Sequence, residues 1–253
     1  MPAYRQRLPE RLGFYPFKFN RCIWIHAVSV GETIAALPLI KALQARYADL
    51  PILVTTMTPT GAARVKSALG DSVSHAYLAY DLPDAVARFL RAMHPVMGII
   101  IETELWPNLL AACRSEKIPV CLVNARLSDK SARGYQRIAS ITRDMLHGLA
   151  LIAANGKVDA ERFIALGARP KRVVVTGNIK FDLELPANLS QRAAALRQGL
   201  GDKRFIWIAA STHAGEEEAV LAAHKKIRAT RPDALLILVP RHPDRFDAVA
   251  KDE

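Results

Sequence analysis

The sequence has few cysteines and no long apolar run, and each absence excludes several classes of protein. Its three cysteines, Cys22, Cys113 and Cys121, show no CxxC or metal-ligand spacing, and its seven histidines form no such pattern either. Neither a disulfide framework nor a metal site is therefore predicted. No stretch reaches the roughly 18 to 20 apolar residues of a membrane span, and no signal peptide is recognisable. We expect reduced, buried thiols in a cytosolic protein that uses no metal and no cofactor.

Acidic residues are also in short supply. The 253 residues include 35 Lys and Arg against 24 Asp and Glu, so the net charge is +11. This surplus of positive charge favours an anionic partner. The candidates are an anionic lipid surface, a phosphate-bearing substrate and nucleic acid. The chain has no RNP motif and no basic helix interleaved with aromatic residues, so no nucleic-acid partner is predicted.

Basic and aromatic residues gather in residues 1–21. This segment holds five Lys or Arg residues, five aromatic residues and one acid, Glu10. Such a composition is typical of an interfacial segment on an anionic membrane. A basic tail that is solvated and packs partly on the following domain is the alternative interpretation.

Short apolar runs alternate with amphipathic stretches, which is the pattern of βαβ units around a buried parallel sheet. Strands are predicted at 22–30, 51–56, 75–78, 97–101, 119–123, 149–153, 172–176, 205–210 and 234–239. Residues 22–180 are expected to form one Rossmann-like doubly wound domain, 181–190 a linker, and 191–253 part of a second such domain. Two strands are too few for a stable doubly wound sheet, so this second domain is expected to be incomplete.

The strongest local signal is a carboxylate where the first predicted strand becomes a helix. Gly31 permits a sharp turn after the strand, and Glu32 follows it directly. Because ligands of open α/β sheets bind at the carboxyl ends of the strands, Glu32 is predicted to lie in a functional site. The alternative is an acid that only complements the helix dipole. Other strands also end in polar clusters, which packing alone does not explain.

Eight such segments follow one another along the chain: His26-Ala-Val-Ser-Val-Gly-Glu32, Thr55-Thr-Met-Thr-Pro-Thr-Gly61, Tyr80-Asp-Leu-Pro83, Glu102-Thr-Glu-Leu-Trp-Pro-Asn108, Asn124-Ala-Arg-Leu-Ser128, Gly177-Asn-Ile-Lys-Phe-Asp182, Ser211-Thr-His-Ala-Gly-Glu-Glu217 and Val239-Pro-Arg-His-Pro243. Together they closely resemble the Kdo transferases, which move 3-deoxy-D-manno-octulosonic acid (Kdo) from CMP-Kdo to lipid A precursors. The resemblance implies an inverting glycosyltransferase of the GT-B fold, without metal, in lipopolysaccharide core biosynthesis. Its implied partners are CMP-Kdo, the acceptor lipid IVA and an anionic membrane, at the cytoplasmic face of the bacterial inner membrane.

The resemblance also implies roles for individual residues. Glu32 is then the general base that takes the proton of the acceptor hydroxyl. Glu102 and Lys180 stabilise an oxocarbenium-like transition state and the departing CMP phosphate. The nucleotide is held by strand-end residues of the second part, namely Pro240, Arg241, Ser211 and Thr212. The helix after Ser211 and Thr212 also offers free N–H groups for an anion.

Three other residues of these motifs are expected to have structural roles. Glu216 and Glu217 are expected to cap the helix that begins near Gly215. Trp106 is expected to be a core aromatic at a helix start rather than a platform for a sugar.

Two departures from the family pattern limit the expected activity. Members of the family begin with a hydrophobic anchor and continue beyond the Pro-Arg-His motif through a Met-Gly-Glu turn and an Asn-Pro-Leu-Glu segment. The present sequence begins at Met1-Pro-Ala-Tyr-Arg5 and contains none of these three features. The chain is therefore expected to be truncated at both ends relative to the family and to bind the membrane peripherally. Two alternatives remain. One is a non-catalytic basic α/β module that binds anionic lipid, and the other is another two-Rossmann enzyme such as a 2-epimerase. No motif reports the number of Kdo units transferred.

Overall fold

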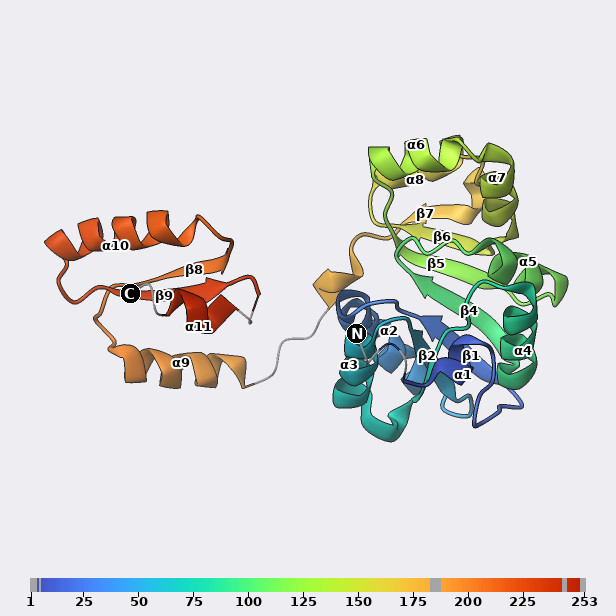
Figure 1. Cartoon of the computed structure of the whole chain (residues 1–253), viewed down its shortest axis with the longest axis horizontal. Coiled ribbons are helices and arrows are strands. Elements are labelled where there is room, and N and C mark those ends of the chain that lie inside the picture. Colours follow the sequence, from blue (N-terminus) through green and yellow to red (C-terminus); the bar gives the residue numbers. More distant parts are fainter. Residues whose placement is uncertain (1–3, 5, 183–187, 243–244, 251–253) are drawn as a thin grey trace. The chain divides into compact units, whose positions relative to one another are not determined.

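The chain folds into two compact units, Met1–Glu184 and Leu185–Glu253. The structure, a computed structural model, describes residues 4, 6–182, 188–242 and 245–250 (Figure 1). The predicted linker, 181–190, includes residues 183–187, which lie outside the described residues. Each unit contains its own parallel sheet.

Unit 1 is built on a seven-stranded parallel sheet in the order β3-β2-β1-β4-β5-β6-β7. Its strands are β1 (Cys22–His26), β2 (Ile52–Thr56), β3 (Ser74–Tyr77), β4 (Pro95–Ile101), β5 (Val120–Ala125), β6 (Leu151–Ala154) and β7 (Val173–Val175). The seven predicted strands of this unit are all present. The first ends at His26 and not at residue 30, because Ser29 leaves the sheet to cap the following helix.

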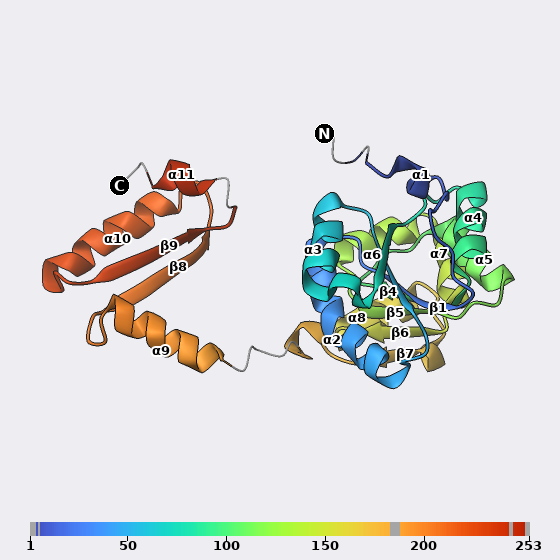
Figure 2. The same ribbon diagram turned by 90° about the horizontal axis from the view of Figure 1, so that it is seen from below.

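Helices cover both faces of this sheet (Figure 1 and Figure 2). They are α1 (Leu8–Arg11), α2 (Val30–Arg46), α3 (Pro59–Leu69), α4 (Pro83–Met93), α5 (Pro107–Ser115), α6 (Asp129–Gln136), α7 (Ala139–Gly148) and α8 (Lys157–Ala165), with the 3-10 turns η2 (Gly70–Ser72), η3 (Pro170–Arg172) and η4 (Ile179–Asp182). β1 is buried along its whole length. Trp24 joins a core with Phe89 of α4, and Ile23 and Ile25 join the opposite core with Ile40 of α2.

The strand order reverses between β1 and β4, which are hydrogen-bonded neighbours in the sheet. β1 leads to β2 and β3 on one side, whereas β4 leads to β5, β6 and β7 on the other. Such a reversal leaves a crevice beyond the carboxyl ends of the two strands, because their connections diverge to opposite sides. A ligand site is expected there.

The segment before β1 is packed on unit 1 along part of its length. Tyr77 N donates to Glu10 Oε2 at 2.8 Å, and Arg11 donates to the Met57 carbonyl at 2.9 Å. The ring of Tyr15 packs on α4. Phe14, by contrast, is 56% exposed. Among the described residues, none of the helices combines the length and the apolar character that crossing a membrane requires.

Unit 2 contains two parallel strands, β8 (Ile206–Thr212) and β9 (Leu235–Pro240), which match the two predicted ones. Its helices are α9 (Leu189–Leu200), α10 (Glu217–Thr230) and α11 (Phe246–Val249). The two-stranded sheet remains partly uncovered, since the Ile208 side chain is 60% exposed.

Candidate functional site

Three predicted catalytic residues meet at the switch point of unit 1. Glu32 lies in the first turn of α2 directly after β1, and Glu102 follows β4, the neighbour of β1. Lys180 lies in η4, which packs against α2. Its Nζ is 3.9 Å from Glu102 Oε1. The strand order therefore brings one cation and two acids from distant parts of the sequence together at the carboxyl ends of the strands.

Glu32 is held in one orientation. Its Oε2 accepts a hydrogen bond from Val28 N at 2.8 Å, and its Oε1 accepts one from Ser29 Oγ at 2.9 Å. Ser29 Oγ in turn caps α2 by accepting from Glu32 N at 3.5 Å. Ser29 and Glu32 thus form a capping box. Glu32 therefore also has the structural role at the helix start that was the alternative to a functional one. Each carboxylate oxygen still has lone-pair capacity for a further donor.

The electrostatic setting of Glu32 raises the pKa of its carboxyl group above the usual value. Glu32 as a whole residue is only 8% exposed. Burial raises its pKa most, the Val28 and Ser29 donors lower it, and the charge of Glu102 raises it further; the net direction is upward. A carboxylate whose pKa lies closer to the working pH is a stronger proton acceptor.

Glu102 has a backbone conformation that non-glycine residues rarely adopt. Its φ is +62°, in the left-handed region, and its N–H donates to the Val123 carbonyl of β5 at 2.9 Å. Residues with such φ values are typically held by their surroundings and concentrate at functional sites. The kink directs the chain out of β4 towards α5.

Glu104 belongs to the same cluster, although sequence reasoning gave it no role. Burial raises its pKa most, and the charge of Glu32 raises it next. Its position two residues after Glu102, on the same strand end, was the only signal in the sequence. Trp106 is the N-cap residue of α5 and packs partly buried against the core, as predicted. Within the described residues, no group of His, Cys, Asp or Glu side chains is arranged to hold a metal ion.

The four predicted nucleotide-binding residues meet at the carboxyl ends of β8 and β9. Thr212 is the register partner of Pro240, and Arg241 N donates to the Thr212 carbonyl at 2.9 Å. Ser211 has a φ of +62° where the ladder shifts register. The Arg241 side chain is exposed at this edge. The residues thus form one polar strand-end cluster within unit 2.

The acids beside this cluster lie at the start of α10, as the sequence suggested, but the Glu216 side chain forms no capping hydrogen bond to the helix. Glu216 is the N-cap residue of α10, and its Oε2 accepts from His213 N at 2.8 Å. Glu217 lies in the first turn but also forms a two-pronged ion pair with Arg245, at 2.9 and 3.2 Å. Arg245 therefore holds the pKa of Glu217 below its usual value. The rings of His213 and His242, 6.2 Å apart, were not singled out in the sequence.

Comparison with known proteins gives a consistent result. A family model described as 3-Deoxy-D-manno-octulosonic-acid transferase (kdotransferase) matches residues 6–183. The chain is 46% identical to the 3-deoxy-D-manno-octulosonic acid transferase of Haemophilus influenzae, over 98% of this chain and 59% of that protein. It is 40% identical to the enzyme of the same name from Bordetella pertussis, over 94% of this chain and 58% of that protein. The chain thus spans about three fifths of the length of these relatives.

A solved structure shows the same fold at low sequence identity. The UDP-GlcNAc 2-epimerase from Neisseria meningitidis, determined with UDP-GlcNAc bound, has a TM-score of 0.61 at 14% identity. The match covers 91% of this chain and 67% of that one. At this identity the likeness concerns the fold alone, which is α/β of the GT-B type, as predicted.

Proposed function

Since the chain belongs to the 3-deoxy-D-manno-octulosonic-acid transferase family, we propose that it transfers Kdo from CMP-Kdo to lipid IVA in lipopolysaccharide biosynthesis. The observation that carries the proposal is the cluster of Glu32, Glu102 and Lys180 at the switch point of unit 1. Ligands of doubly wound sheets bind at this position. The cluster also contains both a buried base and a cation, which the reaction requires.

In the proposed reaction Glu32 accepts the proton of the acceptor hydroxyl. The hydroxyl oxygen then forms a bond to the anomeric carbon of Kdo from the face opposite the phosphate, and the configuration inverts. The bond between that carbon and the phosphate oxygen breaks, and CMP leaves with the electron pair. The capping contacts of Glu32 keep its carboxylate fixed, so little reorientation is needed before proton transfer.

Lys180 and Glu102 stabilise the charges that develop in this step. The Lys180 ammonium acts as a point charge for the phosphate or the Kdo carboxylate, and Glu102 supports the positive charge of the sugar ring. Their side chains are 43% and 31% exposed, with 3.9 Å between the charged atoms. A pair this exposed contributes only about 0–1 kcal/mol to stability. Folding alone therefore does not account for their placement.

The donor nucleotide is assigned to the strand-end cluster of unit 2. The Arg241 guanidinium suits the phosphate of CMP, because it presents several donors in a planar arrangement. Ser211 and Thr212 offer hydroxyl groups at the same strand ends, and Pro240 contributes its backbone atoms. The arrangement of these four residues around one edge supports their role in nucleotide binding.

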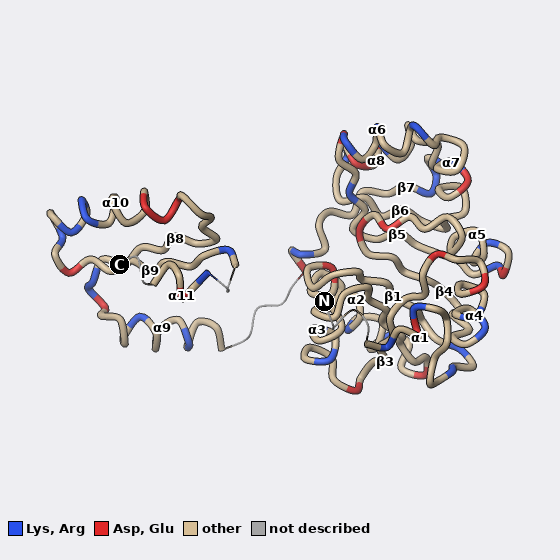
Figure 3. The backbone as a smooth tube through the Cα atoms, in the orientation of Figure 1, with Lys and Arg blue, Asp and Glu red and all other residues tan. Residues whose placement is uncertain are grey.

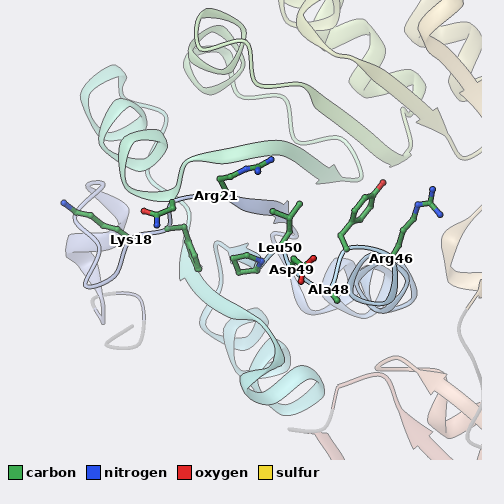
Figure 4. A pocket seen from close by; sticks show the side chains of 10 residues that line it. Lys18, Arg21, Arg46, Ala48, Asp49 and Leu50 are labelled. Atoms are coloured by element: carbon green, nitrogen blue, oxygen red, sulfur yellow. The ribbon is translucent and has the colours of Figure 1, made fainter.

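We further propose that the protein binds the cytoplasmic face of the inner membrane peripherally, since its acceptor is a lipid. Lys18, Arg21 and Arg46 line a hollow of about 680 Å³ near the start of β1 and β2. Figure 4 shows Lys18 and Arg46 at opposite ends of this hollow, with Asp49 and Leu50 between them.

A second hollow adjoins the first and adds to the basic surface. It shares Lys18 and is also lined by Phe14, Arg88 and Arg91. Figure 3 shows basic residues close to α1 and α4 in this region. Basic side chains beside an exposed aromatic ring suit an anionic lipid surface.

The transfer reaction is tested by incubating a transferase that carries this segment with CMP-Kdo and lipid IVA. Mass spectrometry should detect lipid IVA with added Kdo, and CMP should be released in equal amount. A protein without transfer that still binds anionic vesicles would instead indicate the lipid-binding module. Epimerisation of a UDP-N-acetyl sugar, followed in parallel, would indicate the epimerase alternative.

A further inference from the structure

Asn124 occupies the end of β5 in a conformation that needs an explanation. Its φ is +55°, its side chain is 1% exposed, and the ladder between β5 and β6 shifts register around it. Asparagine tolerates the left-handed region better than most residues, but it usually does so in exposed turns. A buried left-handed residue inside a sheet has no such turn to form.

The end of β5 contacts Glu102 and the residue that precedes Lys180. The Val123 carbonyl accepts from Glu102 N at 2.9 Å. The next residue, Asn124, accepts through Oδ1 from Ile179 N at 3.3 Å, and Ile179 directly precedes Lys180. Two adjacent residues of β5 thus hold the backbones on either side of the 3.9 Å ion pair.

The side-chain amide of Asn124 is fixed and only partly paired. Oδ1 also accepts from Asn155 Nδ2 at 3.4 Å. The Ile179 N–H needs an acceptor and the side-chain NH2 group can only donate, so the amide cannot be reversed. Nδ2 is buried and has no hydrogen-bond partner among the described residues. Buried polar groups are nearly always paired in folded proteins. The hydrogen bonds of the described residues therefore account for Oδ1 and leave Nδ2 without a partner.

We propose that Asn124 is a positioning residue for the transfer reaction: its left-handed backbone and its Oδ1 hold η4 so that Lys180 stands beside Glu102. The proposal rests on the proposed function, because it assigns Asn124 a role through Lys180. Electrostatic stabilisation depends on donors and charges that are already in place when the transition state forms. A shift of η4 by about 1 Å is enough to lower the rate roughly a hundredfold.

Three variants separate this role from a general effect on folding. Asn124→Gly keeps the left-handed backbone without strain but removes Oδ1. Asn124→Asp retains an oxygen acceptor for Ile179 N. Lys117→Gly is the matched control, because Lys117 has a φ of +56° in the turn after α5 and makes no contact with η4 in the described hydrogen bonds.

Hydrogen exchange of the 253-residue chain tests the positioning without any assay of activity. The Ile179 amide should exchange at least tenfold faster in Asn124→Gly than in the wild type, and near the wild-type rate in Asn124→Asp and Lys117→Gly. Unchanged exchange at Ile179 in Asn124→Gly would overturn the proposal. If exchange changes as expected and the wild type transfers no Kdo, the proposed function fails while the hydrogen-bond role stands.

Kinetics of an active transferase that carries this segment test the link to Lys180. Asn124→Gly should lower kcat by about tenfold to a hundredfold, with Asn124→Asp within about tenfold of wild type. Added to Lys180→Ala, Asn124→Gly should cause little further loss, because both changes remove the same interaction. Losses that multiply, or a full kcat in Asn124→Gly, would show that Asn124 does not act through Lys180.

Discussion

Replacing Glu32 by glutamine separates catalysis from folding more clearly than any other substitution at the site. Glutamine has nearly the same shape and retains one oxygen, so it can accept from either Val28 N or Ser29 Oγ but not from both. Loss of one such hydrogen bond costs about 0.5–1.5 kcal/mol of stability. The capping box is weakened, and unit 1 should still fold.

The expected effect on the reaction is much larger. General base catalysis contributes about 10² to 10⁴ in rate, which corresponds to roughly 2.7–5.5 kcal/mol in the activation free energy. Glu32→Gln should therefore lower kcat by at least about a hundredfold, with a modest change in melting temperature. Release of CMP from CMP-Kdo in the presence of lipid IVA provides the assay.

The control is Asp159→Asn. Asp159 lies in the first turn of α8, and its Oδ1 accepts from Leu127 N at 2.8 Å, so it shares the helix-start position and the backbone contact of Glu32. This variant should lose similar stability and retain its kcat. Activity of Glu32→Gln within tenfold of wild type would refute the assignment of Glu32 as the base and leave it as a helix cap.

Four further predictions follow from the charges and from unit 2. Burial and Glu32 raise the pKa of Glu104, so its contribution to stability is present below its unfolded pKa and is lost as pH rises through the folded pKa. Glu104→Gln should therefore melt at a higher temperature than wild type at pH 7, with the difference vanishing near pH 4; an equal gain at both pH values would contradict this. Sedimentation with anionic vesicles should show binding that high salt reverses. Lys18→Glu with Arg21→Glu should weaken this binding more than the same charge change at Lys157 and Lys171, and equal weakening would exclude a specific face. Residues 188–242 should show less protection from hydrogen exchange than unit 1, because their two-stranded sheet is partly uncovered. For the same reason CMP should bind this chain weakly, and micromolar affinity by calorimetry would contradict this expectation.

Local patterns predicted the strands well because each strand of unit 1 is a short apolar run with turn residues on both sides. β1 is the clearest case, since it is buried on both faces and its residues are nearly all apolar. The position of Glu32, the proposed base, was predictable for the same reason. Glu32 is a charged residue that directly follows such a run, and the parallel arrangement fixes the edge at which it lies.

Contacts between distant segments were not predictable in the same way. Asn124 and Ile179 are 55 residues apart in sequence, and their hydrogen bond depends on a left-handed backbone that no local pattern indicates. Likewise, the hydrogen bond from Tyr77 N to the Glu10 carboxylate joins two residues that are 67 positions apart in sequence. In both cases the sequence shows a plausible polar residue, and only the folded chain shows what it contacts.

The positions of left-handed residues connect these observations. Among the residues that the structure describes, six non-glycine residues have φ values between +42° and +62°: Arg7, His94, Glu102, Lys117, Asn124 and Ser211. His94 and Lys117 lie at or just after the carboxyl end of a helix, where left-handed residues commonly serve as caps, and Arg7 lies at the start of α1. The other three lie at the carboxyl ends of β4, β5 and β8, where no helix end requires them. Each such residue costs about 1–3 kcal/mol. All three lie at the carboxyl ends of their strands, which is where ligands of α/β proteins bind, and this favours function over folding as the reason for their left-handed conformations.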